Sequence, residues 1–147
     1  MELVYTQQQT VVDGNPIIFN NKFQSNNRNY YHDNESGVIT LSPVINNPMC
    51  QRFAQYELIF VGNIAIPTGG TVGEIGVVFT ESGESAPETR ARFVPAAVDT
   101  FGNVTAVLVT RVPAQCGCRN ISVEVIASAP GGSVLVSEAN LSVKRVA

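Results

Sequence analysis

The stretch at residues 52–66, RFAQYELIFVGNIAI, decides the fold of this chain. Apolar or aromatic residues occupy every second position of its first half, namely Ala54, Tyr56, Leu58 and Phe60. Gln55 and Glu57 lie between them. Successive side chains of a β-strand point to opposite faces of the sheet. The alternation therefore predicts a long strand with one buried face.

Short β-branched runs fill much of the remaining chain, and clusters of Gly, Pro, Asn and Ser separate them. No segment repeats apolar residues at helical spacing over three turns. The predicted strands cover residues 6–12, 16–19, 38–41, 52–66, 72–80, 89–98, 104–112, 120–127 and 134–146, with a brief pairing at 30–31. About eight to ten short strands without a helix predict an all-β fold, an antiparallel jelly-roll sandwich in one domain over residues 1–147.

Charged residues are scarce in this chain. They make up 14% of its 147 residues and leave a net charge of −3, against about 25% charged residues in an average domain. This composition excludes the clustered basic surface of a nucleic-acid-binding protein. The single histidine, His32, rules out most catalytic triads and histidine-rich metal sites. We therefore expect no enzyme activity and no cofactor.

Membrane insertion and secretion are not expected either. The longest apolar candidate, residues 58–67, is interrupted by Gly62 and Asn63, and a membrane helix needs about 20 apolar residues. The first nine residues lack the basic and apolar regions of a signal peptide.

The three cysteines, Cys50, Cys116 and Cys118, allow several interpretations. Together with His32 they could form a zinc site, but their spacing is unlike that of structural zinc sites. One disulfide from Cys50 to Cys116 or Cys118 is a second alternative. Since an odd number of cysteines does not make a disulfide framework, we favour free thiols.

Five segments resemble, in order, the globular heads of bacterial exosporium collagen-like glycoproteins. These heads belong to the tumour-necrosis-factor and complement globular-head superfamily. The segments are TVVDGNPIIFN at 10–20, YHDNESGVITL at 31–41, QYELIF at 55–60, GEIGVVF at 73–79 and ANLSVKRV at 139–146. The resemblance spans nearly the whole chain, about residues 6–147. It implies a jelly roll that assembles as a compact trimer and that binds or coats rather than catalyses.

The chain also departs from this family pattern. It has no Gly-x-y collagen stem, its loop around residues 49–50 is longer and more polar, and residues 61–70 replace a short turn. A head without a stalk is similar to stand-alone subunits on some bacteriophage capsids and fibres. We therefore predict a non-enzymatic homotrimeric head on the exterior of a particle, docked through residues 1–5 onto a capsid or other particle-surface protein. The expected location is a virion surface, with a spore surface as the alternative.

The long strand supplies the candidate subunit interface. Tyr56, Leu58 and Phe60 are core residues by their alternation, but in trimeric jelly rolls one face of this strand also forms the interface. The sequence does not decide which face it is. An alternative function is a lectin-like head that binds a host-surface glycan, with Tyr30, Tyr31 and Asn34 clustered on one loop end.

Other charged candidates favour structural roles. His32, flanked by Asp33 and Glu35, is the one acid–base candidate near neutral pH, but no hydrolase-like motif accompanies it, and a turn histidine is the preferred interpretation. Carboxylates that could bind calcium lack the spacing of a calcium loop and are expected to be solvated; they are Asp33, Glu35, Glu81, Glu84 and Glu88. Arg90 and Arg92 share one strand face, where they could clamp an anion, protect a sheet edge or form an intersubunit salt bridge.

Overall fold

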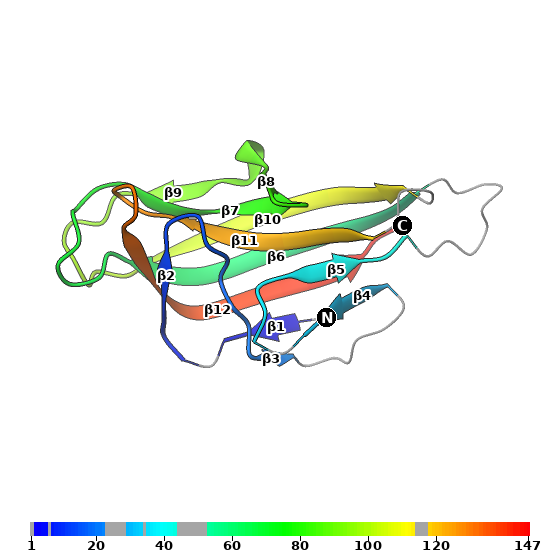
Figure 1. The fold of residues 1–147 in the computed structure, drawn as a ribbon, viewed down its shortest axis with the longest axis horizontal. Coiled ribbons are helices and arrows are strands. Elements are labelled where there is room, and N and C mark those ends of the chain that lie inside the picture. The colour runs from blue at the N-terminus through cyan, green and yellow to red at the C-terminus, as the bar shows by residue number, and fades with distance from the viewer. Residues whose placement is uncertain (1, 6, 23–28, 34, 44–52, 114–117) are drawn as a thin grey trace.

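The computed structural model describes residues 2–5, 7–22, 29–33, 35–43, 53–113 and 118–147. In these residues twelve strands form two six-stranded antiparallel sheets, which pack face to face (Figure 1). Sheet A contains β1 (Glu2–Val4), β2 (Gln9–Val12), β3 (Asn21–Lys22), β6 (Phe53–Ala65), β10 (Gly102–Pro113) and β12 (Ser133–Arg145). Sheet B contains β4 (Tyr30–His32), β5 (Ile39–Leu41), β7 (Ile75–Glu81), β8 (Glu84–Ser85), β9 (Ala91–Phe93) and β11 (Arg119–Ile126). A single 3-10 turn, η1 (Pro87–Thr89), is the one helical element in the described residues.

The strand order is that of a jelly roll. Sheet A runs β10-β6-β12-β1-β3, with β2 also paired to β12, and sheet B runs β4-β5-β11-β7-β8, with β9 also paired to β7. The chain changes sheet between β3 and β4, between β5 and β6, between β6 and β7, and at each step from β9 to β12. Neighbouring strands within a sheet are therefore mostly distant in sequence. The predicted fold class is confirmed.

The described strands outnumber the predicted eight to ten because three short strands, β1, β3 and β8, form where no strand was predicted. β3 lies in the polar stretch 20–29, and β8 lies in the acidic stretch 81–88. Local composition disfavours both strands, since Asn, Lys, Glu and Ser have low strand propensity. The neighbouring strands β1 and β7 supply the backbone partners that hold them.

β6 carries the largest share of the core, as its alternation predicts. Tyr56, Leu58 and Phe60 are fully buried between the sheets. β6 pairs with β10 from Phe53 to Ile64 on one side, and it also pairs with β12 on the other. Burying each such side chain contributes about 1.5–3 kcal/mol. The central strand is therefore fixed on both edges and on one face.

The first twenty residues connect the two sheets. Glu2–Val4 form β1 between β12 and β3, with Leu3 fully buried, and the docking role of residues 1–5 stays a prediction. After β2 the chain turns at Gly14 (φ +78°) and leaves sheet A. Its next residues pair with β11 of sheet B, since the Ile17 N–H donates to the Val123 carbonyl at 2.8 Å. The predicted strand at 16–19 is thus reduced to isolated bridges at Pro16 and Phe19.

Candidate interaction surfaces

The outer face of sheet A carries an apolar strip where β6 and β10 lie side by side. The strip consists of Ile59, Val61, Val107 and Val109. Val107, Val109 and Val61 are 48%, 52% and 38% exposed. Val107 lies opposite Ile59 in the strand register, and Thr105 lies opposite Val61. Because β10 is the last strand of its sheet, the strip reaches the sheet edge.

The residues singled out as a subunit interface lie on the other face of the same strand. Tyr56, Leu58 and Phe60 are fully covered by the chain itself, so they offer no surface to a second copy. Their place is the core, which the alternation also predicted. Any interface on β6 must use the opposite side chains, such as Ile59 and Val61.

Polar side chains border the apolar strip at one end. The Asn103 amide donates to the Asn63 side-chain oxygen at 3.3 Å, and the Asn63 amide donates to the Glu138 carboxylate at 2.8 Å. Glu138 has a left-handed backbone (φ 56°) at a β-bulge in β12. This row of polar side chains crosses the three strands β10, β6 and β12. At the other end of the apolar strip, Glu57 lies opposite Val109 and Lys144. An apolar centre with a polar rim is typical of a protein–protein interface.

The predicted ligand loop is a strand in the structure. Tyr30 and Tyr31 both belong to β4, so their side chains point to opposite faces. Tyr30 is half-buried and packs against the core, whereas Tyr31 is exposed. The Tyr31 hydroxyl donates to the Asp33 carboxylate, and this hydrogen bond, together with the carboxylate charge, raises the pKa of Tyr31. Asn34 lies outside the described residues. The two tyrosines therefore do not form one binding surface.

His32 occupies the inner face of β4 rather than a turn. Its side chain is 1% exposed, and its Nε2 donates to the Ser36 carbonyl at 2.7 Å. The Phe19 ring packs edge-on against it, with the ring centroids 6.3 Å apart. Burial lowers the pKa of His32, and the nearby Lys22 ammonium lowers it further. A substrate in solution could not reach this imidazole, so its role is structural.

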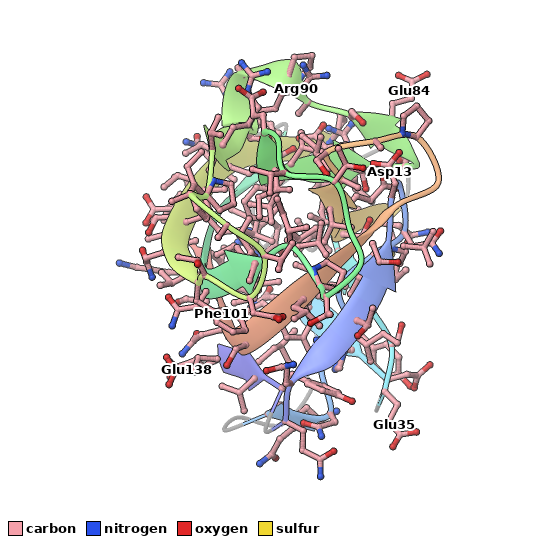
Figure 2. All side chains as sticks on the ribbon, turned by 90° about the vertical axis from the view of Figure 1, so that its left-hand side faces the viewer. Asp13, Glu35, Glu84, Arg90, Phe101 and Glu138 are labelled. Carbon is pink, nitrogen blue, oxygen red and sulfur yellow. The ribbon has the colours of Figure 1, made fainter. Side chains whose placement is uncertain are left out.

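The acidic and basic candidates near η1 are spread along one rim. Glu81, Glu84 and Glu88 line an open depression of about 400 Å³, where Arg119 lies 3.3 Å from the Glu81 carboxylate. The part of the chain that the structure describes holds no group of three His, Cys, Asp or Glu side chains placed to bind a metal ion. Arg92 pairs with Glu74 at 3.0 Å within the chain. Figure 2 shows Glu84 and Arg90 on one side of the sandwich and Glu35 and Glu138 on the other.

Among the cysteines, Cys118 alone falls within the described ranges, and it is free and exposed. Cys50 and Cys116 lie outside the described residues, so the alternatives for their pairing stay as predictions. No helix in the described ranges is long and apolar enough to cross a membrane.

A surface that the sequence did not reveal lies at the side of the sandwich, between β2 and residues 15–18. We call it the side groove. It is an open depression of about 570 Å³. Its lining includes Tyr5, Gln8, Thr10, Val12, Asn15 and Ile18. In Figure 1 the dark blue chain rises as β2, turns, and descends beside it. Two segments that pair with different sheets form its walls, which is why no single sequence motif could reveal it.

Comparisons with known proteins support the fold alone. No protein-family model matches the chain, and no curated protein sequence matches it. Murine APRIL, a tumour-necrosis-factor-family protein, has a TM-score of 0.54 at 13% identity, over 95% of this chain and 95% of APRIL. The C-terminal domain of EclA, a sugar-binding protein, has a TM-score of 0.41 at 17% identity, over 97% and 81% of the two chains. A family 35 carbohydrate-binding module from Clostridium thermocellum has a TM-score of 0.35 at 20% identity, over 96% and 97%. With its strand order and its likeness to APRIL, the chain has a jelly-roll fold.

Proposed function

We propose that this chain is a non-enzymatic surface head that assembles as a homotrimer through the apolar strip on β6 and β10. In this proposal the trimer coats the exterior of a particle, either a phage capsid or fibre or, as the alternative, a spore. Its partners are two further copies of itself and a protein of the particle surface. The exposed apolar strip is the observation that carries the proposal.

The strip is costly to leave in water. Exposed β-branched side chains along a twelve-residue edge strand, β10, present both apolar surface and unpaired backbone groups. Proteins usually cover or charge such an edge, because it otherwise pairs with other chains without control. Val107 and Val109 occupy positions of β10 where a charged side chain would prevent uncontrolled pairing with other chains. A closed ring of copies would cover the strip and leave no free edge for further growth.

The titratable side chains of the described residues do not gather at one accessible site, which supports a role without catalysis. General acid–base catalysis needs a titratable group within reach of a substrate. His32 is covered by the fold, and the carboxylates Glu81, Glu84 and Glu88 lie on an open rim with no histidine. A coat or binding role requires surfaces rather than such groups.

Light scattering after size exclusion tests the assembly. The wild-type chain should elute with three times the mass of one chain. Replacing the two strip valines of β10, Val107→Asp and Val109→Asp, should give a folded monomer, because it would place two charges in a desolvated interface. The matched control is Val72→Asp, since Val72 is also 48% exposed but lies outside the strip.

Three results would contradict the proposed assembly: a monomeric wild type at high concentration, a trimer that survives both strip substitutions, or equal loss of assembly in the Val72 control. The location on a particle needs a separate measurement. An antibody raised against the folded chain should label intact virions or spores of the organism that encodes it, and unlabelled particles of both kinds would contradict this part of the proposal.

A further inference from the structure

The side groove has polar groups that the fold does not use. Within the described residues, no hydrogen bond of the chain engages the side chains of Gln8, Thr10 or Asn15, although all three line the groove. An amide side chain has two N–H donors and an oxygen acceptor, and a hydroxyl can both donate and accept. These groups can therefore bind a ligand without breaking any bond of the fold.

Gln9 differs from its neighbour Gln8 in this respect. Its amide nitrogen donates to the Ile18 carbonyl at 2.9 Å, and its amide oxygen accepts the Ile18 N–H at 3.1 Å. The Gln9 side chain thus pairs with Ile18 as a neighbouring strand would. This clamp holds the two walls of the groove together. It also occupies the backbone groups of Ile18 that an extended peptide would need in order to add a strand.

The groove carries no charge. None of its lining residues is acidic, basic or histidine. The nearest carboxylate on the connecting turn, Asp13, is already engaged, because its Oδ1 accepts the Ala127 N–H at 2.9 Å. An anionic or cationic ligand would find no counter-charge here, so the complementary ligand is neutral.

Apolar surface lies beside the polar groups. Val12 and Ile18 are both exposed, and Pro16 belongs to the wall formed by residues 15–18. A neutral ligand that matches this lining has hydroxyl groups along its edges and an apolar C–H face. Carbohydrate rings have this combination, since each hydroxyl donates and accepts while the ring face packs on apolar side chains.

From these features we infer that the side groove binds a neutral carbohydrate. Gln8, Thr10 and Asn15 hydrogen-bond the sugar hydroxyls, and Val12, Pro16 and Ile18 contact a ring face. This site is separate from the strip on β6 and β10, and it does not depend on the proposed trimer. It is also distinct from the tyrosine loop that the sequence suggested for a glycan.

An immobilised array of neutral oligosaccharides is the first test, followed by calorimetry with the strongest soluble oligosaccharide. Calorimetry reports binding per chain, so assembly does not enhance the signal through avidity. The double variant Gln8→Ala with Asn15→Ala should bind about tenfold more weakly or worse, because two ligand hydrogen bonds are lost. A second variant, Thr10→Trp, should abolish binding by filling the groove.

Gln7→Ala is the matched control, since Gln7 is exposed on the same segment but is not part of the lining. It should bind as the wild type does, and all variants should keep the wild-type melting temperature and mass. The inference is overturned if no neutral oligosaccharide binds, if the groove variants bind as strongly as Gln7→Ala, or if the groove binds members of a peptide library and no sugar. A monomeric wild type that still binds through the groove would contradict the proposed trimer and leave the carbohydrate site standing.

Discussion

Both faces of β6 carry apolar residues, but the two faces have different surroundings. Its inner face consists of Tyr56, Leu58 and Phe60, all fully buried against sheet B. Its outer face is also apolar in the middle, at Ile59 and Val61, but no part of the described chain covers Val61 to the same extent. An apolar side chain therefore identifies a core position only when a second layer lies over it. Without that layer, a contiguous patch of the same residue type is a candidate surface for another molecule.

The largest expected effect comes from the inner face. Phe60→Ala should lower the free energy of unfolding by about 3–5 kcal/mol, because it leaves a cavity in the core. The adjacent outer-face variant Val61→Ala should change the unfolding free energy of a single chain by only about 0.5 kcal/mol. Urea denaturation of both variants at low protein concentration measures this contrast. Equal losses would mean that the outer face is as well packed as the core.

Tyr56→Phe tests the one polar group at the buried end of the inner face. The Tyr56 hydroxyl donates toward the carbonyl oxygens of Asn29 at 2.9 Å and Ser42 at 2.7 Å. Removing it leaves both oxygens without this donor, which should cost about 1–3 kcal/mol of unfolding free energy. The control is Tyr31→Phe, whose hydroxyl donates to Asp33 on the exposed face of β4. Tyr31→Phe should leave the unfolding free energy nearly unchanged. A loss as large as that of Tyr56→Phe would contradict the contrast between the buried and the exposed hydroxyl.

The inner face of each long strand was predictable from the sequence because alternation depends only on neighbours along the chain. The core positions of β6 and those of β11, such as Val123 and Val125, follow directly from the spacing of apolar residues. The short strand β3 was not predictable, since its polar residues pair only because β1 lies beside them. The same reasoning applies to β1 itself, whose burial depends on the distant strand β12.

The candidate surfaces were less predictable than the core. Tyr30 and Tyr31 lie in the strand β4, and Asn34 lies outside the described residues, so the ligand site of these three residues stays a prediction. The side groove depends on the crossing from β2 to sheet B after Gly14, where residue 17 pairs with Val123 far along the chain. No local pattern records that pairing. The apolar strip combines residues of β6 and β10, and its exposure depends on the absence of a layer over the outer face among the described residues, which no local pattern records.

The pH dependence of stability separates an inner from an outer titratable group. His32 lies on the inner face of β4, where burial lowers its pKa below the ordinary value of 6.5. The unfolded chain therefore takes up a proton at a higher pH than the folded chain. The contribution of neutral His32 to the free energy of unfolding is fully present above pH 6.5. It falls as the pH drops through this value toward the lowered pKa.

Denaturation in urea at a series of pH values measures this slope. His32→Gln should flatten it between about pH 7 and pH 5, because no other histidine titrates there, even though the variant is less stable overall. An NMR titration of the His32 ring in the folded chain should show a midpoint below 6.5. An unchanged slope in the variant, or a midpoint above that value, would contradict the assignment of His32 to the inner face.

The outer face of β11 should show a smaller effect of opposite sign. Glu124 is half-buried there, opposite Val78 in the strand register, and burial raises its pKa above 4.5. The folded chain holds this proton more tightly than the unfolded chain, so stability falls as the pH rises through 4.5 toward the raised pKa. Glu124→Gln should therefore unfold at a slightly higher urea concentration than the wild type at about pH 7, and at the same concentration at about pH 3.5, where both forms are neutral. A gain of equal size at both pH values would show that the amide improves packing rather than relieving a buried charge. A loss at about pH 7 would mean that the carboxylate has a stabilising partner on the outer face, and that this face is more fully covered than the inner–outer comparison allows.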